Sequence, residues 1–199
     1  MSHAAHSYSA APELAFLSGG GGMGTALRTR DWDSTPLGPP TNWPPSLKTL
    51  VGVMLAADQP MFVAWGPERL LLYNDGYAPM LADRHPAALG RPFMAVWSEV
   101  EAELTPLFEQ VFTGEPVHMA DIELYLDRPG RPREAHFAFS YTPVRDETGA
   151  VVGLFCPCTE TTDQVFADRR PQGGGGAAAD AVPTDAGLRR RADRSGPRL

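Results

Sequence analysis

The chain has 199 residues, of which 43% are hydrophobic, and this length suits one globular domain with flanking segments rather than two large domains. Its formal net charge is −7, unevenly placed: residues 167–199 hold seven Arg and four Asp, so the preceding 166 residues carry −10. An acidic body lacks the electrostatic footprint of nucleic-acid-binding proteins, and nucleic acid is therefore not an expected partner.

No apolar run approaches the ~18 residues of a membrane span, and the first residues lack the basic start of a secretory signal. We therefore expect a cytoplasmic protein that binds no membrane. Cys156 and Cys158 lie two residues apart, which leaves no loop for a structural disulfide to close, and a metal site would need more His or Cys ligands nearby. Buried thiols that act as small hydrophobes are expected, and a redox-sensing pair is the alternative.

A glycine-rich stretch, FLSGGGGMG (16–24), places Gly19, Gly21 and Gly24 in a GxGxxG pattern. This pattern binds a pyrophosphate only between a strand and a helix, and here a short apolar run precedes it while a proline-rich segment follows. The pattern therefore predicts a flexible loop. Residues 1–15 are predicted to be disordered, and residues 1–43 to form a flexible N-terminal segment that leads into the domain.

A helix is expected after Asn42, which is a good N-cap, with Pro44 and Pro45 in its first turn. Its apolar positions recur at helical spacing, so this accessory helix should cover a sheet: Leu47, Leu50, Val51, Met54 and Leu55. Two short apolar runs, MFVAW (61–65) and RLLLYN (69–74), flank Gly-Pro-Glu and predict a β-hairpin.

Brief helices interrupted by prolines are expected over 75–100, and such helices commonly surround a pocket. Ser98 and Glu101 have the spacing of a capping box, and an apolar face continues to Gly114, a natural helix end. Pro106 leaves two alternatives: a helix that begins after a Thr105 cap, or a helix from Ser98 that is kinked.

The last third of the chain has the alternation of β-strands. Ala120, Ile122, Leu124 and Leu126 alternate with polar residues, HFAFSYTPV (136–144) follows the turn at 129–130, and AVVGLFCPC (150–158) follows the turn at 146–149. The order of elements predicts an α+β fold with a five-stranded antiparallel sheet, helices packed on one face, an N-terminal accessory helix and a disordered tail.

Several sequence blocks, in this order, resemble the PAS sensor domains, specifically the PAS fold-4 type found at the N-terminus of bacterial sensor histidine kinases. The blocks are FLSGGGGMG, DWDSTPLGPPTNWPPSLKT, PMFVAWGPERLLLYNDGYAPML, HPAALGRPFMAVW and FAFSYTPVRDETGAVVGLFCPCTETT. The resemblance covers roughly residues 16–166, with the PAS domain proper placed at 44–162. It implies a cavity for a small ligand and a C-terminal helix that passes the signal on and joins two subunits.

The resemblance also bears on the cofactor, which stays unknown. Haem-binding members carry a histidine on the longer helix, and residues 99–114 hold none; His118, just beyond, is interpreted as a strand-edge residue. Flavin-binding photosensors carry a reactive cysteine among the small helices, and residues 75–100 hold none. Residues that could frame a pocket, or simply form the core, are aromatic with one polar anchor: Phe62, Trp65, Tyr73, Asn74, Tyr77, Phe93, Trp97, Phe137, Phe139 and Tyr141.

The expected signal exit follows the last strand and comprises Thr159, Glu160, Thr161, Thr162 and Asp163, whose side chains can cap a helix. Residues 163–199 are then expected to hold the start of a linker helix and a disordered low-complexity tail, because Pro171 and the glycines at 173–176 end any helix. The Gly, Ala, Pro and Arg bias of this tail suggests a frameshift or truncation, and a genuine tail is the rival interpretation.

No catalytic or metal-binding set is expected: Ser140-Tyr141 has no matched base, and His136 beside Glu134 is interpreted as a strand residue. The sequence predicts a non-enzymatic sensor module of a two-component-type protein, homodimeric through its flanking helices, with a small ligand and a kinase or response-regulator partner. The input fragment of a sensor histidine kinase, or a stand-alone thiol redox sensor or adaptor, are the alternatives.

Overall fold

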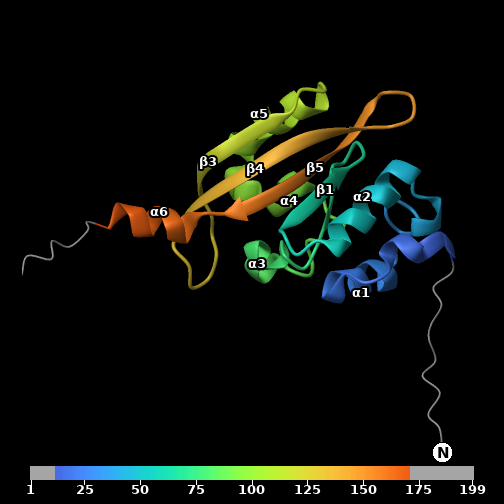
Figure 1. The fold of residues 1–199 in the computed structure, drawn as a ribbon, viewed down its shortest axis with the longest axis horizontal. Coiled ribbons are helices and arrows are strands. Elements are labelled where there is room, and N and C mark those ends of the chain that lie inside the picture. The colour runs from blue at the N-terminus through green and yellow to red at the C-terminus, as the bar shows by residue number, and fades with distance from the viewer. Residues whose placement is uncertain (1–11, 171–199) are drawn as a thin grey trace, which may run out of the picture. The chain divides into compact units, whose positions relative to one another are not determined.

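A five-stranded antiparallel sheet forms the centre of the molecule (Figure 1), in a computed structural model that describes residues 12–170. The strand order is β2-β1-β5-β4-β3. The strands are β1 (Met61–Trp65), β2 (Leu70–Tyr73), β3 (Val117–Tyr125), β4 (Glu134–Arg145) and β5 (Val151–Glu160). The predicted hairpin and the three alternating strands are thus confirmed, with β5 placed centrally between β1 and β4.

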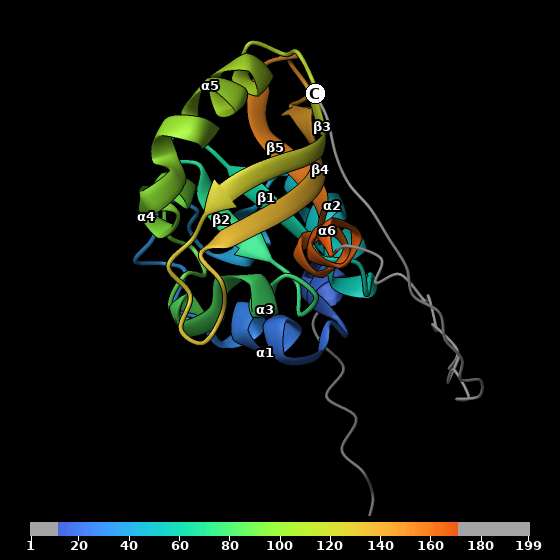
Figure 2. The ribbon, with the colours of Figure 1, turned by 90° about the vertical axis from the view of Figure 1, so that its left-hand side faces the viewer.

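The remaining elements are helical. They are η1 (Pro12–Leu17), α1 (Gly21–Thr29), η2 (Pro40–Asn42), α2 (Pro45–Ala56), α3 (Ala78–Leu81), η3 (Ala82–Arg84), α4 (Phe93–Val96), η4 (Ser98–Val100), α5 (Glu101–Phe112) and α6 (Thr162–Arg169). Figure 2 shows α4 and α5 on one side of the sheet, with α2 and α6 on the other. We call the side covered by α4 and α5 the inner face.

The N-terminal region differs from the sequence prediction. The glycine-rich stretch was predicted to be a flexible loop, but Gly21 begins helix α1, and residues 12–15 lie in η1 rather than in a disordered segment. The backbone N–H groups of Gly22 and Met23 donate to the Asp75 carboxylate at 2.9 and 2.7 Å. A carboxylate at a helix N-terminus satisfies orphan N–H groups and opposes the helix dipole, so Asp75 occupies the place that a phosphate would take. Residues 1–11 lie outside the described part.

Two helices begin at other residues than the predicted caps indicate. Helix α2 starts at Pro45 after Pro44, not after an Asn42 cap, and it buries Leu47, Val51, Met54 and Leu55 as predicted. Ser98 lies in η4 and makes no capping bond to α5, which begins at Glu101 with Pro106 inside it. The capping-box prediction is therefore wrong, because a 3-10 turn separates Ser98 from the helix.

Candidate functional site

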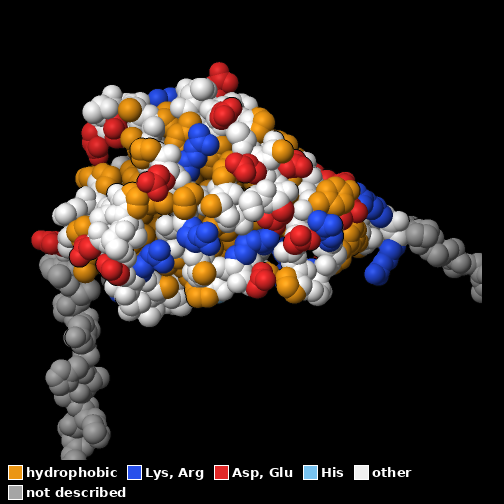
Figure 3. Space-filling model, turned by 180° about the vertical axis from the view of Figure 1, so that it is seen from behind, with side chains coloured by type: hydrophobic (Ala, Val, Ile, Leu, Met, Phe, Trp, Pro, Cys, Tyr) orange, Lys and Arg blue, Asp and Glu red, His pale blue; other side chains and the backbone are white. Residues whose placement is uncertain are grey.

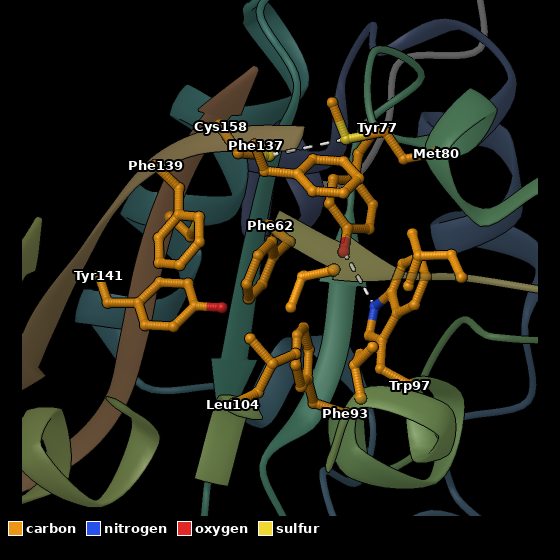
Figure 4. Close-up of a pocket in the computed structure, with 14 residues that line it drawn as sticks. Phe62, Tyr77, Met80, Phe93, Trp97, Leu104, Phe137, Phe139, Tyr141 and Cys158 are labelled. Atoms are coloured by element: carbon orange, nitrogen blue, oxygen red, sulfur yellow. Dashed lines mark hydrogen bonds between the residues drawn. The ribbon is translucent and has the colours of Figure 1, made fainter. Parts of the chain in front are cut away.

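An apolar cavity lies between the inner face of the sheet and the small helices (Figure 4). Strand alternation explains the sheet side: Phe137, Phe139 and Tyr141 stand two apart on β4, and Cys156 and Cys158 stand two apart on β5. The full lining, from β1 round to β5, is Phe62, Tyr77, Met80, Phe93, Trp97, Val100, Leu104, Leu124, Leu126, Phe137, Phe139, Tyr141, Cys156 and Cys158.

The lining rings are packed against one another. The ring of Phe62 stacks on Phe93 at 5.0 Å and meets the edge of Tyr141 at 6.0 Å, and Phe139 stacks on Tyr141 at 4.3 Å. The open space left between them is about 50 Å³. One water needs roughly 10–15 Å³ by this measure, so the cavity holds a few water-sized groups, and a larger ligand requires side chains to move.

Two hydroxyl groups give this apolar space its polar character. Trp97 Nε1 donates to the Tyr77 hydroxyl at 3.0 Å. The Tyr141 hydroxyl points into the cavity, and no other residue drawn in Figure 4 hydrogen-bonds to it. Burial raises the pKa of both tyrosines well above the usual value, with nearby thiols adding to the effect. Both hydroxyls are therefore neutral at physiological pH, and Tyr141 offers an open donor and acceptor.

Three of the predicted pocket residues lie elsewhere. Trp65 is on the other face of the sheet, where its ring covers Gly153, since a Cβ there would lie 2.8 Å from Trp65 Cε3. Tyr73 is buried with its hydroxyl 3.0 Å from His85 Nδ1, and burial, opposed by Arg30, raises the pKa of Tyr73 to about 12.

Asn74 is a structural residue rather than a ligand anchor. Its amide nitrogen donates to the carbonyls of Met54, Ala57 and Gln59, and its amide oxygen accepts from the N–H groups of Met61 and Tyr77. The two N–H donors, one of them shared between two carbonyls, and both lone pairs of the oxygen are thus all used to hold the segment between α2 and β1.

The other seven predicted residues line the cavity, and seven further ones were missed. The missed residues are aliphatic or sulfur-containing: Met80, Val100, Leu104, Leu124, Leu126, Cys156 and Cys158. Their helical or alternating spacing marks them as core in the sequence, but spacing alone does not distinguish a residue that borders a cavity from one that fills the core.

The predicted signal exit spans the end of β5 and the start of α6, but its side chains do not cap the helix. Thr162 Oγ1 accepts from the His136 N–H at 3.0 Å and donates to Glu160, while Thr161 Oγ1 is buried without a partner among the described residues. The Thr161 N–H donates to the His136 carbonyl at 2.8 Å. The first residue of α6 and Thr161, just before the helix, are thus joined to β4 through both backbone groups of His136.

Glu160 anchors this junction through an ion pair. Both of its carboxylate oxygens accept from Arg128 at 2.8 Å, and Arg131 lies 3.4 Å away. The Arg128 side chain is almost fully buried. Burial is the largest single effect and opposes ionisation of Glu160, but the hydrogen bonds and charge of Arg128, together with Thr162 and Arg131, outweigh it and lower the pKa of Glu160.

One pairing contradicts the sequence interpretation of Ser140 as a residue without a matched base. In the register of β3 and β4 His118 lies opposite Ser140, and His118 Nδ1 is 2.9 Å from Ser140 Oγ. His118 is exposed, and among the described residues no carboxylate hydrogen-bonds to it to complete a triad.

A fold of this kind, with an antiparallel sheet that closes a small cavity under short helices, is typical of small sensory domains. The family model of the PAS fold matches residues 58–165, more than half of the chain. The chain therefore belongs to the PAS fold family.

Several solved structures are similar to this chain. They include an RNA-binding light-oxygen-voltage receptor (21% identity, 60% of this chain and 34% of that chain, TM-score 0.46) and the PAS domain of BvgS from Bordetella pertussis (20%, 62% and 91%, 0.42). A PAS domain from Colwellia psychrerythraea is 16% identical, over 59% of this chain and 98% of that chain, with a TM-score of 0.43. The chain spans only 34% of the light-oxygen-voltage receptor. No curated protein sequence matches it.

Within residues 12–170, no helix is both long and apolar enough to cross a bilayer.

Proposed function

We propose that the chain is the signal-sensing input module of a bacterial two-component-type protein, which binds a small ligand in the inner-face cavity and relays the signal through β5 into α6. The observation that supports this most is the position of β5. This strand contributes Cys156 and Cys158 to the cavity lining and runs directly into α6, which begins two residues after the strand ends.

The cavity also indicates the class of ligand. Its lining is apolar apart from two tyrosine hydroxyls, two thiols and the Trp97 indole N–H that donates to Tyr77, and only Tyr141 has a hydroxyl without a partner among the residues drawn in Figure 4. The ligand is therefore a small, largely apolar molecule with a single hydrogen-bonding group. A space of about 50 Å³ argues for a compact molecule rather than a drug-sized one of roughly 300 Å³ or more.

The partners are a second copy of the chain, joined through the flanking helices, and a kinase or response regulator; the chain itself carries no catalysis. On the face seen in Figure 3, Lys and Arg side chains are interspersed with Asp and Glu, which supports a protein rather than a nucleic-acid partner. The thiol redox sensor is less favoured, because burial raises the pKa of Cys156 and reactive cysteines need an accessible thiolate.

Thermal unfolding in the presence of phenol, compared with benzene, tests the cavity. A saturating probe at a hundredfold excess over Kd should stabilise the protein by about 2.7 kcal/mol. Replacing Tyr141 by Phe should remove the preference for phenol, a loss of about 1 kcal/mol, while leaving the fold intact.

A matched pair on α5 provides the control. Leu104→Phe should fill the cavity and abolish stabilisation by either probe, whereas Leu107→Phe, on the same helix but outside the lining, should not. Equal stabilisation of wild type and Leu104→Phe would contradict the proposed ligand site.

A further inference from the structure

A cluster of charged side chains lies on the outer face of the sheet, the face opposite the cavity, where β3 and β4 meet α6. His136 is only 2% exposed, and its ring lies against Phe166 of α6. His136 Nδ1 is 2.9 Å from Asp121 Oδ1, and His136 Nε2 is 2.9 Å from Glu134 Oε1. From the sequence alone, His136 is predicted to be an ordinary strand residue.

The register of the sheet explains why these groups meet. Glu123 on β3 is the direct cross-strand partner of His136, and Glu134 stands two residues before His136 on the same face of β4. A bulge between Met119 and Ile122 shifts the pairing of β3 and leaves Asp121 on this side. Three carboxylates thus surround one buried imidazole.

Arg169, in the last turn of α6, supplies the cation for this group. Its guanidinium pairs with Glu134, lies 3.8 Å from Glu123 Oε2, and is 3.4 Å from His136 Nε2. Asp121, Glu123 and Glu134 can carry three negative charges. A protonated His136 and Arg169 carry only two positive charges, so the group keeps a net negative charge. The side chain of Arg169 is 52% exposed, so the group is open to solvent on the side where the cation sits.

We propose that Glu123, Glu134 and His136 form a divalent transition-metal site, in which the ion takes the place of the Arg169 guanidinium. Ligand atoms of these three residues lie within 4.8 Å of one another. Ligand atoms at 2.0–2.2 Å from one tetrahedral ion are about 3.4 Å apart, so closure requires side-chain movements on the order of 1 Å. One imidazole and two carboxylates suit Zn²⁺, Co²⁺ or Mn²⁺ better than Ca²⁺.

Asp121 acts here as the positioning residue. By accepting from Nδ1–H it keeps that proton on Nδ1, so that Nε2 can bind the ion once Nε2 has lost its own proton. This is the carboxylate–histidine–metal arrangement of many zinc sites. The proton that bridges Nε2 and Glu134 leaves to solvent when the ion enters.

Binding of the ion should affect α6, because the ion and Arg169 of that helix compete for the same carboxylates. Metal binding removes the side-chain contacts of the last turn of α6 with Glu123 and Glu134. The bonds of His136 with Thr161, just before the helix, and with Thr162, its first residue, remain. The expected result is a helix whose C-terminal end is freed while its start stays attached. This input is separate from the cavity, so its failure leaves the proposed ligand site untouched.

Titration calorimetry with Zn²⁺, and the visible absorption of bound Co²⁺, test the site in the 199-residue chain. A background in which His3 and His6 are replaced by Gln removes another source of zinc binding. One equivalent of Zn²⁺ should bind, Glu123→Gln should weaken it at least tenfold, and Asp121→Asn should weaken it roughly 10–100-fold. Glu123→Gln should disturb the fold little, because Glu123 is exposed.

Two further variants decide the interpretation. Arg169→Gln removes the competing cation and should strengthen Zn²⁺ binding, whereas a purely structural ion-pair group would gain no affinity from its loss. His118→Gln, an exposed histidine on the same sheet, should change nothing. Absence of stoichiometric binding, or binding that survives Glu123→Gln and is lost on replacing Cys156 and Cys158 by Ser, would overturn the proposal.

Discussion

Strand β4 carries two different sites on its two faces. Phe137, Phe139 and Tyr141 face the apolar cavity, while His136 faces carboxylates and Arg169 beneath α6. The inner face is stabilised by burial of rings, which depends on volume and packing. On the other face, the contacts among His136, the carboxylates and Arg169 are ion pairs and hydrogen bonds. Their strength changes with the protonation of each group and is lost when one partner is removed. Both faces connect to α6: β5, which borders the cavity, runs into it, and His136 contacts Phe166 and Arg169 of the helix.

The largest expected effect comes from the ring at the centre of the inner face. Phe62→Ala should destabilise the protein by about 3–5 kcal/mol, because Phe62 contacts Tyr77, Phe93 and Tyr141 and its loss leaves a cavity. Chemical denaturation measures the change. Phe155→Ala, on the other face of β5 and only half-buried, is the matched control and should cost clearly less. Similar costs for both variants would contradict the division between the faces.

A smaller effect on stability, which depends on pH, is expected at the ion pair between Glu160 and Arg128. Glu160→Gln should cost about 1.5–3 kcal/mol near neutral pH, because it weakens hydrogen bonds to the buried charge of Arg128. The pKa of Glu160 is lowered in the folded state, so its stabilisation is present above the unfolded pKa of ~4.3 and is lost as pH falls through the lower folded value.

Denaturation at several pH values checks the sign. The difference between wild type and Glu160→Gln should shrink below about pH 4. Glu99→Gln provides a comparison, because Glu99 pairs with Arg84 away from α6. A difference that stays constant down to the acid limit would show that Glu160 acts through packing rather than charge.

The cavity residues of the inner face are easier to predict from the sequence than the cluster around His136 on the outer face. Period-two alternation places Phe137, Phe139 and Tyr141 on one face regardless of strand partners, and these three are among the predicted pocket residues that border the cavity. Trp65 belongs to the same hairpin as Phe62 but has the opposite parity, which the alternation itself could have excluded. Asn74 was misjudged because its partners are backbone carbonyls of a distant segment.

The outer cluster could not be predicted from spacing. Glu123 meets His136 only because of the register of β3 and β4, and a bulge that no residue pattern announces places Asp121 beside them. The GxGxxG pattern fails as a nucleotide signal for a related reason. Its N–H groups are used by Asp75, a residue more than fifty positions away in the chain. The predicted low-complexity tail after Arg170 lies outside the described residues.

Hydrogen exchange along β5 and α6, with and without phenol, tests the central claim most directly. If a ligand in the cavity is sensed through β5, phenol should change the exchange rates of amides in Val151–Glu160 and in Thr162–Arg169, and Leu104→Phe should abolish both changes. Binding of phenol that protects the cavity residues while leaving the exchange of α6 unchanged would contradict the account.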